Sequence, residues 1–342
     1  MELKTWIIHQ AREIGIDKIG FTHAHPFEEW RNPLLSQQEN GHLSGFEHPA
    51  LEERLNPALT FERPRTLIAL ALVYPSQTVR LNDGRPRGMF SRSSWGVDYH
   101  DLLREKMDLL IEKIRQRIRD ARFMPMVDTG PLIDVATAHR AGLGFIGKNG
   151  LLITETFGSF VYLGEIVTDL DIEPDLPMDS QCGSCQKCIK ACPGKALLGN
   201  GSMNAKRCLS YHTQTKGPME MEFRKKIRNV LYGCDICQLV CPFNKGKHVL
   251  LHPKMEPDPY TIQPDLEELL TISNKEFNAR FGHMAGSWRG KKNLQRNAII
   301  ALANLKSTAS LPLLKKLANE ESRPDILETY HWAIHELENP TS

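Results

Sequence analysis

The sequence has no apolar run long enough to cross a bilayer. The longest, TLIALALVYP at 66–75, has ten residues, whereas a spanning helix needs about 20. We expect it to form a buried strand instead. The N-terminal stretch MELKTWIIHQAREIGIDKIGF has acidic residues and helical periodicity where a secretory signal would have a basic start and an apolar run. These absences predict a cytoplasmic protein without a membrane span.

Net charge and aromatic side chains are also scarce. The formal charge is only +2 and aromatic residues make up 7% of the chain, so affinity for nucleic acid must come from local basic patches rather than from a global field. The 342 residues allow two or three domains of about 100 to 200 residues each.

Cysteine is limited to eight positions, and their spacing is specific. Cys182, Cys185, Cys188 and Cys192 form C-x2-C-x2-C-x3-C-P, whereas Cys234, Cys237 and Cys241 form C-x2-C-x3-C-P, with Cys208 between the two runs. In two-cluster bacterial ferredoxins the last cysteine of each run binds the other cluster. The pattern therefore predicts two [4Fe-4S] clusters with two ligand sets: Cys182, Cys185, Cys188 and Cys241; and Cys192, Cys208, Cys234 and Cys237.

Zinc and disulfides are the alternatives for these cysteines. Zinc uses C-x2-C pairs in tetrahedral sites, but it gives no reason for a run of four cysteines that ends in proline. Disulfides belong to oxidising compartments and to small domains with little core. Two clusters use all eight thiols and leave no ligand position empty.

Composition changes divide the chain into three parts, and the expected fold class is α+β. Residues 1–170 alternate helical and strand patterns and predict an α/β domain, and residues 171–250 form a ferredoxin-like module. Residues 251–342 combine a Pro-rich connector with helices in which ALANL at 301–305 and AIHEL at 333–337 match, 32 positions apart. This match indicates HEAT-like helical repeats, although their usual period is about 40–47 residues. Unrelated helices remain the alternative.

Three local patterns resemble sites but lack part of the required context. AGLGFIGKNG at 141–150 contains G-x-G-x-x-G, but a dinucleotide site needs a strand before the glycines. The preceding GPLIDVATAHRA instead predicts a helix that begins at Pro131. His139 and Gly142 match the second half of D-x-H-x-x-G, a motif that supplies a histidine ligand to cobalt. Thr137 stands where this motif has aspartate, so the motif is broken. His248 and His252 lack a third ligand.

Asp128 ends the apolar strand FMPMVDT at a turn. Partial burial there raises the pKa of a carboxyl toward the range of a general acid. An equally good interpretation is that Asp128 caps the helix expected at Pro131.

Basic residues gather in SWRGKKNLQR at 287–296 and in TQTKG at 213–217 together with the nearby residues 224–228. Such patches suit a phosphate backbone, with the tryptophan ring available for stacking on a base. A solvated helix face would have the same composition.

Several stretches together resemble the epoxyqueuosine reductase family. They include VDTGP at 127–131, HRAGLGFIGKN at 139–149, SFVYLGE at 159–165, both cysteine runs, LYGCD at 231–235 and WRGKK at 288–292. The resemblance covers nearly the whole chain. It implies removal of the epoxide oxygen from the modified wobble base of tRNA as water, with electrons passed through two [4Fe-4S] clusters to cobalamin.

The resemblance also implies roles for particular residues. Asp128 would be the catalytic acid. Cobalamin would contact eight positions: Arg54, Ser91, Asp128, Leu152, Leu163, Leu209, Cys234 and Asp235. Some relatives have Cys where Ser91 stands, so only a contact is expected there. The tRNA would bind Lys216, Arg289, Lys291 and Lys292.

The expected partners are tRNA carrying epoxyqueuosine and an external low-potential electron donor, with the protein itself a monomer. One alternative is an enzyme like the reductive dehalogenases, which also combine cobalamin with two clusters. The other is a two-cluster electron-transfer or RNA-binding protein without a reaction of its own.

Overall fold

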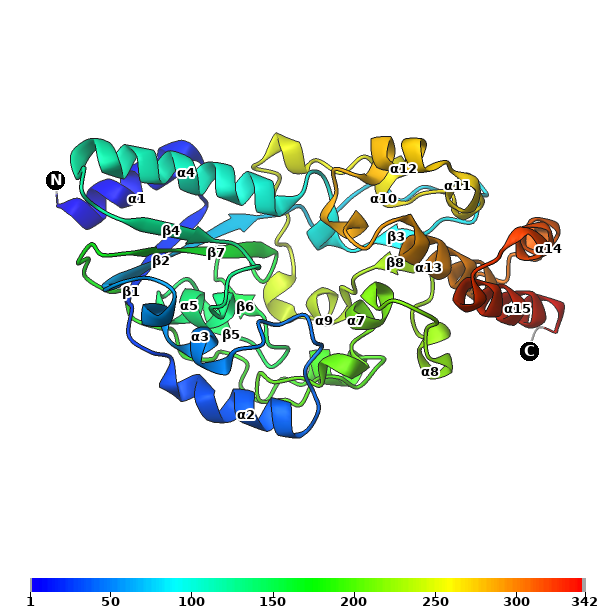
Figure 1. Cartoon of the computed structure of the whole chain (residues 1–342), viewed down its shortest axis with the longest axis horizontal. Coiled ribbons are helices and arrows are strands. Elements are labelled where there is room, and N and C mark those ends of the chain that lie inside the picture. Colours follow the sequence, from blue (N-terminus) through cyan, green and yellow to red (C-terminus); the bar gives the residue numbers. More distant parts are fainter. Residues whose placement is uncertain (1, 340–342) are drawn as a thin grey trace. The chain divides into compact units, whose positions relative to one another are not determined.

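The computed structural model describes residues 2–339, which form two compact units (Figure 1). The first unit contains residues 2–74, 99–206 and 236–251, and the second contains residues 75–98, 207–235 and 252–339. Each unit is assembled from three separate stretches, and the predicted cluster module contributes to both. The division into three parts by function stays a prediction.

A four-stranded sheet organises the first unit, in the order β1-β2-β7-β4, with every strand antiparallel to its neighbours. The strands are β1 (Lys18–His23), β2 (Thr66–Val73), β4 (Phe123–Met126) and β7 (Val161–Thr168). All eight residues of β2 are buried, which confirms the buried strand predicted from its apolar run. The sheet and the helices around it confirm a mixture of α and β structure.

Helices cover both faces of this sheet (Figure 1). The helices α1 (Leu3–Ile14) and α4 (Tyr99–Arg117) lie on one face, and α5 (Asp134–Arg140) lies on the other. A Cβ atom at Gly164 of β7 would come within 2.5 Å of the Met107 side chain and 2.9 Å of the Leu103 side chain. Glycine at this position therefore lets α4 approach the sheet closely.

The remaining elements of the first unit are short. They are α2 (Arg31–Glu39), α3 (Leu51–Leu55), α6 (Lys187–Ala191), α9 (Ile236–Leu239) and the two-stranded sheet of β5 (Phe145–Ile146) and β6 (Leu152–Ile153). The helices α6 and α9 pack on each other, although 44 residues separate them in the chain. Their contact matters because they lie in the two cysteine runs.

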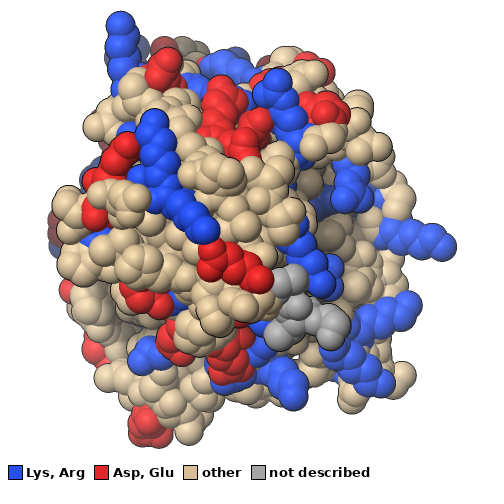
Figure 2. Space-filling model, turned by 90° about the vertical axis from the view of Figure 1, so that its right-hand side faces the viewer, with Lys and Arg blue, Asp and Glu red and all other residues tan. Residues whose placement is uncertain are grey.

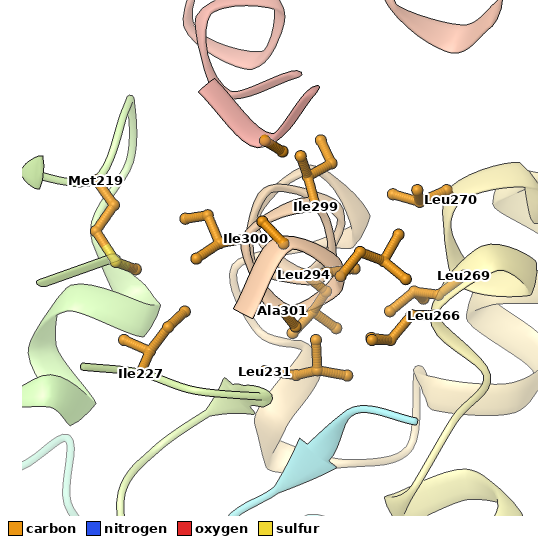
Figure 3. Packing of buried hydrophobic residues seen from close by; sticks show 14 of the residues in the cluster. Met219, Ile227, Leu231, Leu266, Leu269, Leu270, Leu294, Ile299, Ile300 and Ala301 are labelled. Atoms are coloured by element: carbon orange, nitrogen blue, oxygen red, sulfur yellow. The ribbon is translucent and has the colours of Figure 1, made fainter. Parts of the chain in front are cut away.

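The second unit is built around one buried helix, α13 (Lys291–Asn304). Figure 3 shows its apolar side chains directed to several sides, with Leu266, Leu269 and Leu270 on one side and Met219 and Ile227 on another. The polar residues Asn293, Gln295, Arg296 and Asn297 of this helix are buried as well, so α13 lies at the centre of the unit.

Short elements surround α13. They are β3 (Met89–Phe90), which pairs in parallel with β8 (Val230–Tyr232), and the helices α7 (Leu209–Gln214), α8 (Met221–Arg224), α10 (Pro259–Ile262), α11 (Leu266–Thr271), α12 (Asn274–Phe281), α14 (Leu311–Glu320) and α15 (Pro324–Glu338). The two A-[L/I]-x-x-L segments fall at the ends of α13 and α15, which pack on each other. Within residues 2–339, no helix has the length and apolar character to span a membrane.

The helix after Asp128 begins later than the sequence predicts. It begins at Asp134 rather than at Pro131, and Ile133 before it has an extended backbone. Leu132 is 6% exposed and packs in an apolar cluster with Met126, which places residue 132 in the connecting turn. The interpretation of Asp128 as the cap of a helix at Pro131 is therefore wrong.

The glycines of the G-x-G-x-x-G pattern follow α5 and precede β5 and β6. Gly142 has a φ of 72° just beyond the helix end, which is typical of a helix C-terminus. The prediction that a helix precedes these glycines is therefore confirmed, whereas the dinucleotide fingerprint has a strand before them.

Candidate functional site

The first predicted set of cluster ligands lies within the first unit. Burial raises the pKa of the Cys241 thiol, and the neighbouring thiols of Cys182, Cys188 and Cys185 raise it further. The same interactions act on Cys188 from Cys182 and Cys185. The thiol of Cys241, from the second run, therefore lies beside the three thiols of the first run, as the crossed ligand pattern requires.

Lys148 holds the loop that carries Cys182 and Cys185 through its backbone N–H and its side chain. The Lys148 N–H donates to Cys182 Sγ at 3.5 Å, and Lys148 Nζ donates to the carbonyls of Gly183 at 2.6 Å and Cys185 at 3.1 Å. Hydrogen bonds to cysteine sulfur are one of the means by which proteins tune the potential of a cluster. Lys148 belongs to the FIGKN segment, so this stretch supports the cluster loop.

The second ligand set draws Cys192 and Cys237 from the first unit and Cys208 and Cys234 from the second, and it stays a prediction from spacing. Cys192 Sγ accepts a hydrogen bond from the Ala196 N–H at 3.2 Å. All eight cysteines are half-buried. Among residues 2–339, no group of three or more His, Cys, Asp or Glu side chains is arranged to hold a single metal ion.

Asp128 follows β4 in a turn and has a left-handed backbone, with a φ of 53°. Its side chain is 62% exposed, and its Oδ2 lies 3.4 Å from Nε2 of His100. In the register of the sheet Met126 pairs with Glu165, so Asp128 comes out of the sheet beside β7. An exposed carboxyl in this position can reach a bound substrate.

Two further carboxyls, those of Glu165 and Asp134, lie close to Asp128. Glu165 on β7 is 1% exposed, and its carboxyl faces that of Asp134 at the start of α5. Burial raises the pKa of Asp134, although the facing Glu165 side chain and the Asp128 N–H oppose the rise. Burial also holds the pKa of Glu165 well above its usual range, and the charge of Asp134 adds to this effect.

The sequence analysis missed these two residues and the aromatic rings beside Asp128. Tyr162 stacks on Tyr99 with ring centroids 4.3 Å apart, and Tyr99 stacks on His100 at 4.1 Å. Tyr74 contacts the other side of Tyr162 at 4.5 Å. These ring contacts connect Tyr74, which follows β2, to His100, which lies beside Asp128. In the sequence, these residues were indicated only by Glu165, a carboxylate within the apolar strand segment FVYLGEIVTDL.

The cobalamin positions predicted in the first unit lie on the α5 side of the sheet. Leu152 is buried and Leu163 is half-buried, and both pack with a cluster of small side chains, chiefly alanines of β2 and α5. Continuing the pairing of β4 with β7 would bring residue 128 opposite Leu163. Arg54 lies on α3, and burial lowers the pKa of its guanidinium group.

The structure brings together the predicted positions of the second unit. The Ser91 N–H donates to the Tyr232 carbonyl at 2.9 Å. Arg92 donates to Asp235 Oδ2 from its backbone N–H at 3.0 Å and from Nη1 at 2.9 Å. Cys234 lies on the same loop, and Leu209 begins α7, which packs on β8. The segments around Ser91 and Cys234 therefore form one local structure.

The two basic segments also meet within the second unit. Buried Arg296 donates from Nη1 to the carbonyls of Thr215 at 2.7 Å and Gly217 at 2.8 Å, and Asn293 Nδ2 donates to the Thr215 carbonyl at 2.8 Å. The loop with Lys216 is therefore fixed against α13. Arg296, counted in the sequence as part of a basic patch, is a structural residue.

The four basic residues predicted to bind tRNA differ in their surroundings. Lys216 is exposed, and the Arg289 guanidinium group lies 3.7 Å from the centre of the Trp288 ring. Lys291 Nζ donates to a backbone carbonyl at 3.0 Å, and Lys292 pairs with Asp325 at 2.9 Å. Figure 2 shows Lys and Arg side chains grouped along the right-hand side of the face in view.

Comparisons with known proteins agree with this geometry. The family description "Epoxyqueuosine reductase QueG, DUF1730" matches residues 54–129, and "4Fe-4S double cluster binding domain" matches residues 181–244, which include all eight cysteines. An epoxyqueuosine reductase of Lactococcus garvieae (strain Lg2) is 52% identical over 98% of this chain and 97% of its own. That of Bacillus subtilis (strain 168) is 50% identical over 99% of this chain and 89% of its own.

Solved structures match equally well. A crystal structure of epoxyqueuosine reductase with an epoxyqueuosine-modified tRNA-Tyr stem loop superposes with a TM-score of 0.96 at 50% identity, over 99% of this chain and 91% of that chain. The structure of the enzyme from Streptococcus thermophilus superposes with a TM-score of 0.95 at 45% identity, over 100% of this chain and 92% of that chain. The cluster domain, the position of Asp128 and these full-length matches lead to one conclusion: the chain belongs to the epoxyqueuosine reductase family.

Proposed function

We propose that this protein reduces epoxyqueuosine to queuosine at the wobble position of tRNA. The observation that carries the proposal is that an exposed acid, Asp128, and the ligand set Cys182, Cys185, Cys188 and Cys241 lie in one compact unit of a chain from this family. Both carbon–oxygen bonds of the epoxide break and a carbon–carbon double bond forms. Two electrons and two protons are consumed, and the oxygen leaves as water.

Two [4Fe-4S] clusters, held by the two sets of cysteines, would supply electrons one at a time from an external low-potential donor. The first set of four cysteines fits a cluster because its thiols converge from both runs and a backbone N–H is directed at Cys182 Sγ. Cys192, Cys208, Cys234 and Cys237 would hold the other. Iron–sulfur clusters carry single electrons over a wide range of potentials, set partly by such hydrogen bonds.

Cobalamin is the second cofactor of the proposal. An apolar surface with Leu152 and half-buried Leu163, on the α5 side of the sheet, fits the flat face of a macrocycle. Arg54 would complete the contacts of the first unit, and the contacts of the second would come from Ser91, Leu209, Cys234 and Asp235. When bound, cobalamin supplies cobalt-centred reducing chemistry at the epoxide carbon.

Asp128 donates a proton to the epoxide oxygen as its bond to carbon breaks. The developing alkoxide needs a proton in the transition state, and a carboxylic acid within hydrogen-bond reach supplies it. His100, at 3.4 Å from Oδ2, orients this carboxyl. The left-handed backbone at residue 128 directs the side chain out of the sheet, where a substrate can approach.

Lys216, Arg289, Lys291 and Lys292 would bind the phosphate backbone of the tRNA. Arg296 and Asn293 fix the loop of Lys216 against α13, so the exposed charge of Lys216 has a defined place on the second unit. Trp288, 51% exposed, offers a ring for stacking on a base. The helices α13 to α15 would form the HEAT-like repeats of this surface.

An anaerobic assay tests the proposal. The protein, reconstituted with iron, sulfide and cobalamin, is mixed with a strong reductant and tRNA carrying epoxyqueuosine, and the digested nucleosides are analysed by mass spectrometry. We expect the loss of one oxygen atom, dependent on cobalamin and on reductant. If the clusters are intact and no queuosine forms, the proposal is wrong.

A further inference from the structure

A cavity of about 520 Å³ lies at the C-terminal end of α13. The loop before β3, the segment between α8 and β8, the end of α13 and the last turn of α15 line it, and all belong to the second unit. The helix α13 has 14 residues and is therefore about 20 Å long. The cavity is thus separate from Lys291 and Lys292, which lie at the start of the same helix.

The lining of the cavity has an excess of positive charge. Among the described residues that line it, Glu336 is the only acid, and it pairs with Lys225 at 2.9 Å. The other three cations, Arg80, Arg228 and Lys306, are exposed. No group of residues 2–339 forms an ion pair or a hydrogen bond with their side chains. Three unpaired cations around one cavity repel each other, and an anion in the cavity would relieve this repulsion.

Hydrogen bonds fix the backbone at two of these cations. Buried Gln263 donates to the carbonyl of the residue before Arg80 at 2.8 Å and accepts from the N–H of the residue after it at 3.3 Å. Asn304 Nδ2 donates to the Arg228 carbonyl at 2.8 Å. The segments that carry Arg80 and Arg228 therefore have defined positions beside the cavity.

Arg228 and Lys306 have left-handed backbones, with φ values of 52° and 55°. This conformation is unfavourable for a residue with a Cβ. Lys306 stands just beyond the end of α13, where glycine is the usual residue. Strained residues of this kind persist mainly at functional sites. Two of them at one cavity indicate that their positive charges have a use that glycine could not supply.

A phosphodiester backbone fits this lining. Arginine and lysine bind phosphate oxygens through charge-assisted hydrogen bonds, and the three cations reach the cavity from three separate segments of the chain. The proposed substrate is a tRNA, which is a polymer of phosphates. A molecule of this kind can contact both ends of α13, about 20 Å apart.

We propose that the cavity of Arg80, Arg228 and Lys306 is a second phosphate site, which binds a stretch of the tRNA backbone distinct from the one at Lys291 and Lys292. None of the three residues is among the four predicted to bind tRNA. This inference rests on the proposed function and adds a second region of contact with the same substrate.

Glycine variants test the site, because glycine removes the charge and the backbone strain together. Arg228→Gly and Lys306→Gly should be at least as stable as wild type and yet bind tRNA less tightly. Each lost phosphate contact should lower the slope of log affinity against log salt by about 0.7–0.9, which corresponds to about fivefold in affinity at about 0.15 M salt. Fluorescence anisotropy of the reconstituted protein with full-length tRNA, at several salt concentrations, measures both quantities.

Arg63→Gly is the matched control. Arg63 is exposed, lies in the first unit and has a φ of 53°, so the variant loses the same charge and the same strain. Its affinity for tRNA and its salt slope should equal those of wild type. Equal losses in all three variants would mean that only net charge matters, and this result would overturn the proposal. Unchanged affinity in both cavity variants would overturn it as well.

Two further measurements separate the possible failures. Calorimetry with inorganic phosphate distinguishes a free ion from a tRNA phosphate: a site that binds the ion in wild type only, while tRNA affinity is the same in all variants, disproves the proposal. Queuosine formation reports on the proposed function alone. Wild-type protein that makes queuosine while both cavity variants bind tRNA normally disproves only the second phosphate site. Wild-type protein that makes no queuosine disproves the proposed function itself.

Asparagine variants repeat the test if a glycine variant does not fold. Asparagine has no charge and tolerates a left-handed backbone better than most residues. Arg228→Asn and Lys306→Asn should show the same loss of affinity and of salt slope, and wild-type values in both would again overturn the proposal.

Discussion

Asp128 has a left-handed backbone conformation, which is uncommon for residues with a Cβ although aspartate adopts it more readily than most. A left-handed φ costs a residue with a Cβ about 1–2 kcal/mol, and such conformations persist mainly at functional sites. Here the strain is offset by the hydrogen bond from the Asp128 N–H to Asp134. The conformation leaves the side chain exposed, at 62%, although the strand before it is part of the sheet.

We predict that Asp128→Asn abolishes turnover but retains both cofactors. Asparagine keeps the shape of the side chain and its contact with His100, but it has no acidic proton to donate. The rate of queuosine formation should fall by about 10²- to 10⁴-fold, the usual contribution of a positioned acid. Iron content and cobalamin absorbance serve as controls, and wild-type turnover in the variant would exclude Asp128 as the acid.

Glu165 should make the folded protein less stable as the pH rises. Its pKa is raised by burial, so the folded chain keeps a proton that the unfolded chain releases above a pKa of about 4.3. The free energy of unfolding therefore decreases with rising pH from there up to the folded pKa. Each unit of pH in this window lowers stability by about 1.4 kcal/mol for one such group.

The Glu165→Gln variant should not show this decrease in the free energy of unfolding with rising pH, because glutamine does not ionise. We predict that the melting temperature of the variant, relative to wild type, increases between about pH 5 and pH 8, where the folded and unfolded states of the wild type differ in bound protons. Melting curves followed by circular dichroism would measure the difference. A difference in melting temperature that stays constant with pH would contradict the raised pKa.

At the scale of elements, the loop after β8 depends on Gly233. This glycine has a φ of 74°, and a Cβ there would lie 2.1 Å from Ser91 Oγ. The Gly233 N–H also donates to Thr213 Oγ1 at 3.0 Å. The next residue is Cys234, so the close approach of the Ser91 side chain to the Gly233 backbone helps to determine where this predicted cluster ligand lies.

We predict that Gly233→Ala lowers stability by more than the about 1–2 kcal/mol of left-handed strain and reduces bound iron. Gly84→Ala is the matched control, because Gly84 has a φ of 76° and no atom within 4 Å of its added Cβ. Urea unfolding and iron analysis would compare the two variants. Equal losses of stability would mean that contact with Ser91 has no energetic effect.

The packing of α6 on α9 leads to a prediction about the cysteines. Cys182→Ser and Cys241→Ser lie in different runs but should each remove the same cluster, leaving about four of the eight irons that two cubane clusters hold. The double variant should lose no more iron than either single variant. A double variant that loses both clusters would show that Cys241 does not belong with Cys182.

At the scale of the whole molecule, the basic surface of the second unit should govern binding of tRNA. Arg296 donates its hydrogen bonds to carbonyls inside the unit, and Lys292 is paired with Asp325. Lys216 and Arg289 are the better candidates for phosphate contacts, because one is exposed and the other stacks on an exposed tryptophan.

We predict that Lys216→Glu together with Arg289→Glu weakens tRNA binding and reduces its dependence on salt. Each lost phosphate contact should lower the slope of log affinity against log salt by about 0.7–0.9. Arg12→Glu with Arg119→Glu, both exposed in the first unit, makes the same change in net charge and should leave the slope unchanged. If both pairs have equal effects, the binding depends only on global charge.

Local patterns were enough to predict much of this protein. The spacing of the cysteines predicts two ligand sets because each cubane needs four thiolates. The apolar run at 66–75 became the buried strand β2, since burial of apolar side chains drives its formation. The resemblance of several motifs to one family was confirmed by full-length relatives.

Only the tertiary structure revealed what depends on contacts between distant segments. The sequence could not show that α5 begins at Asp134, because the burial of Leu132 determines the length of the turn. Nor could it separate structural Arg296 from the other basic residues. The Asp134–Glu165 pair was invisible for the same reason: a carboxylate in a strand acquires a shifted pKa only when the packed fold removes water and places another carboxylate beside it.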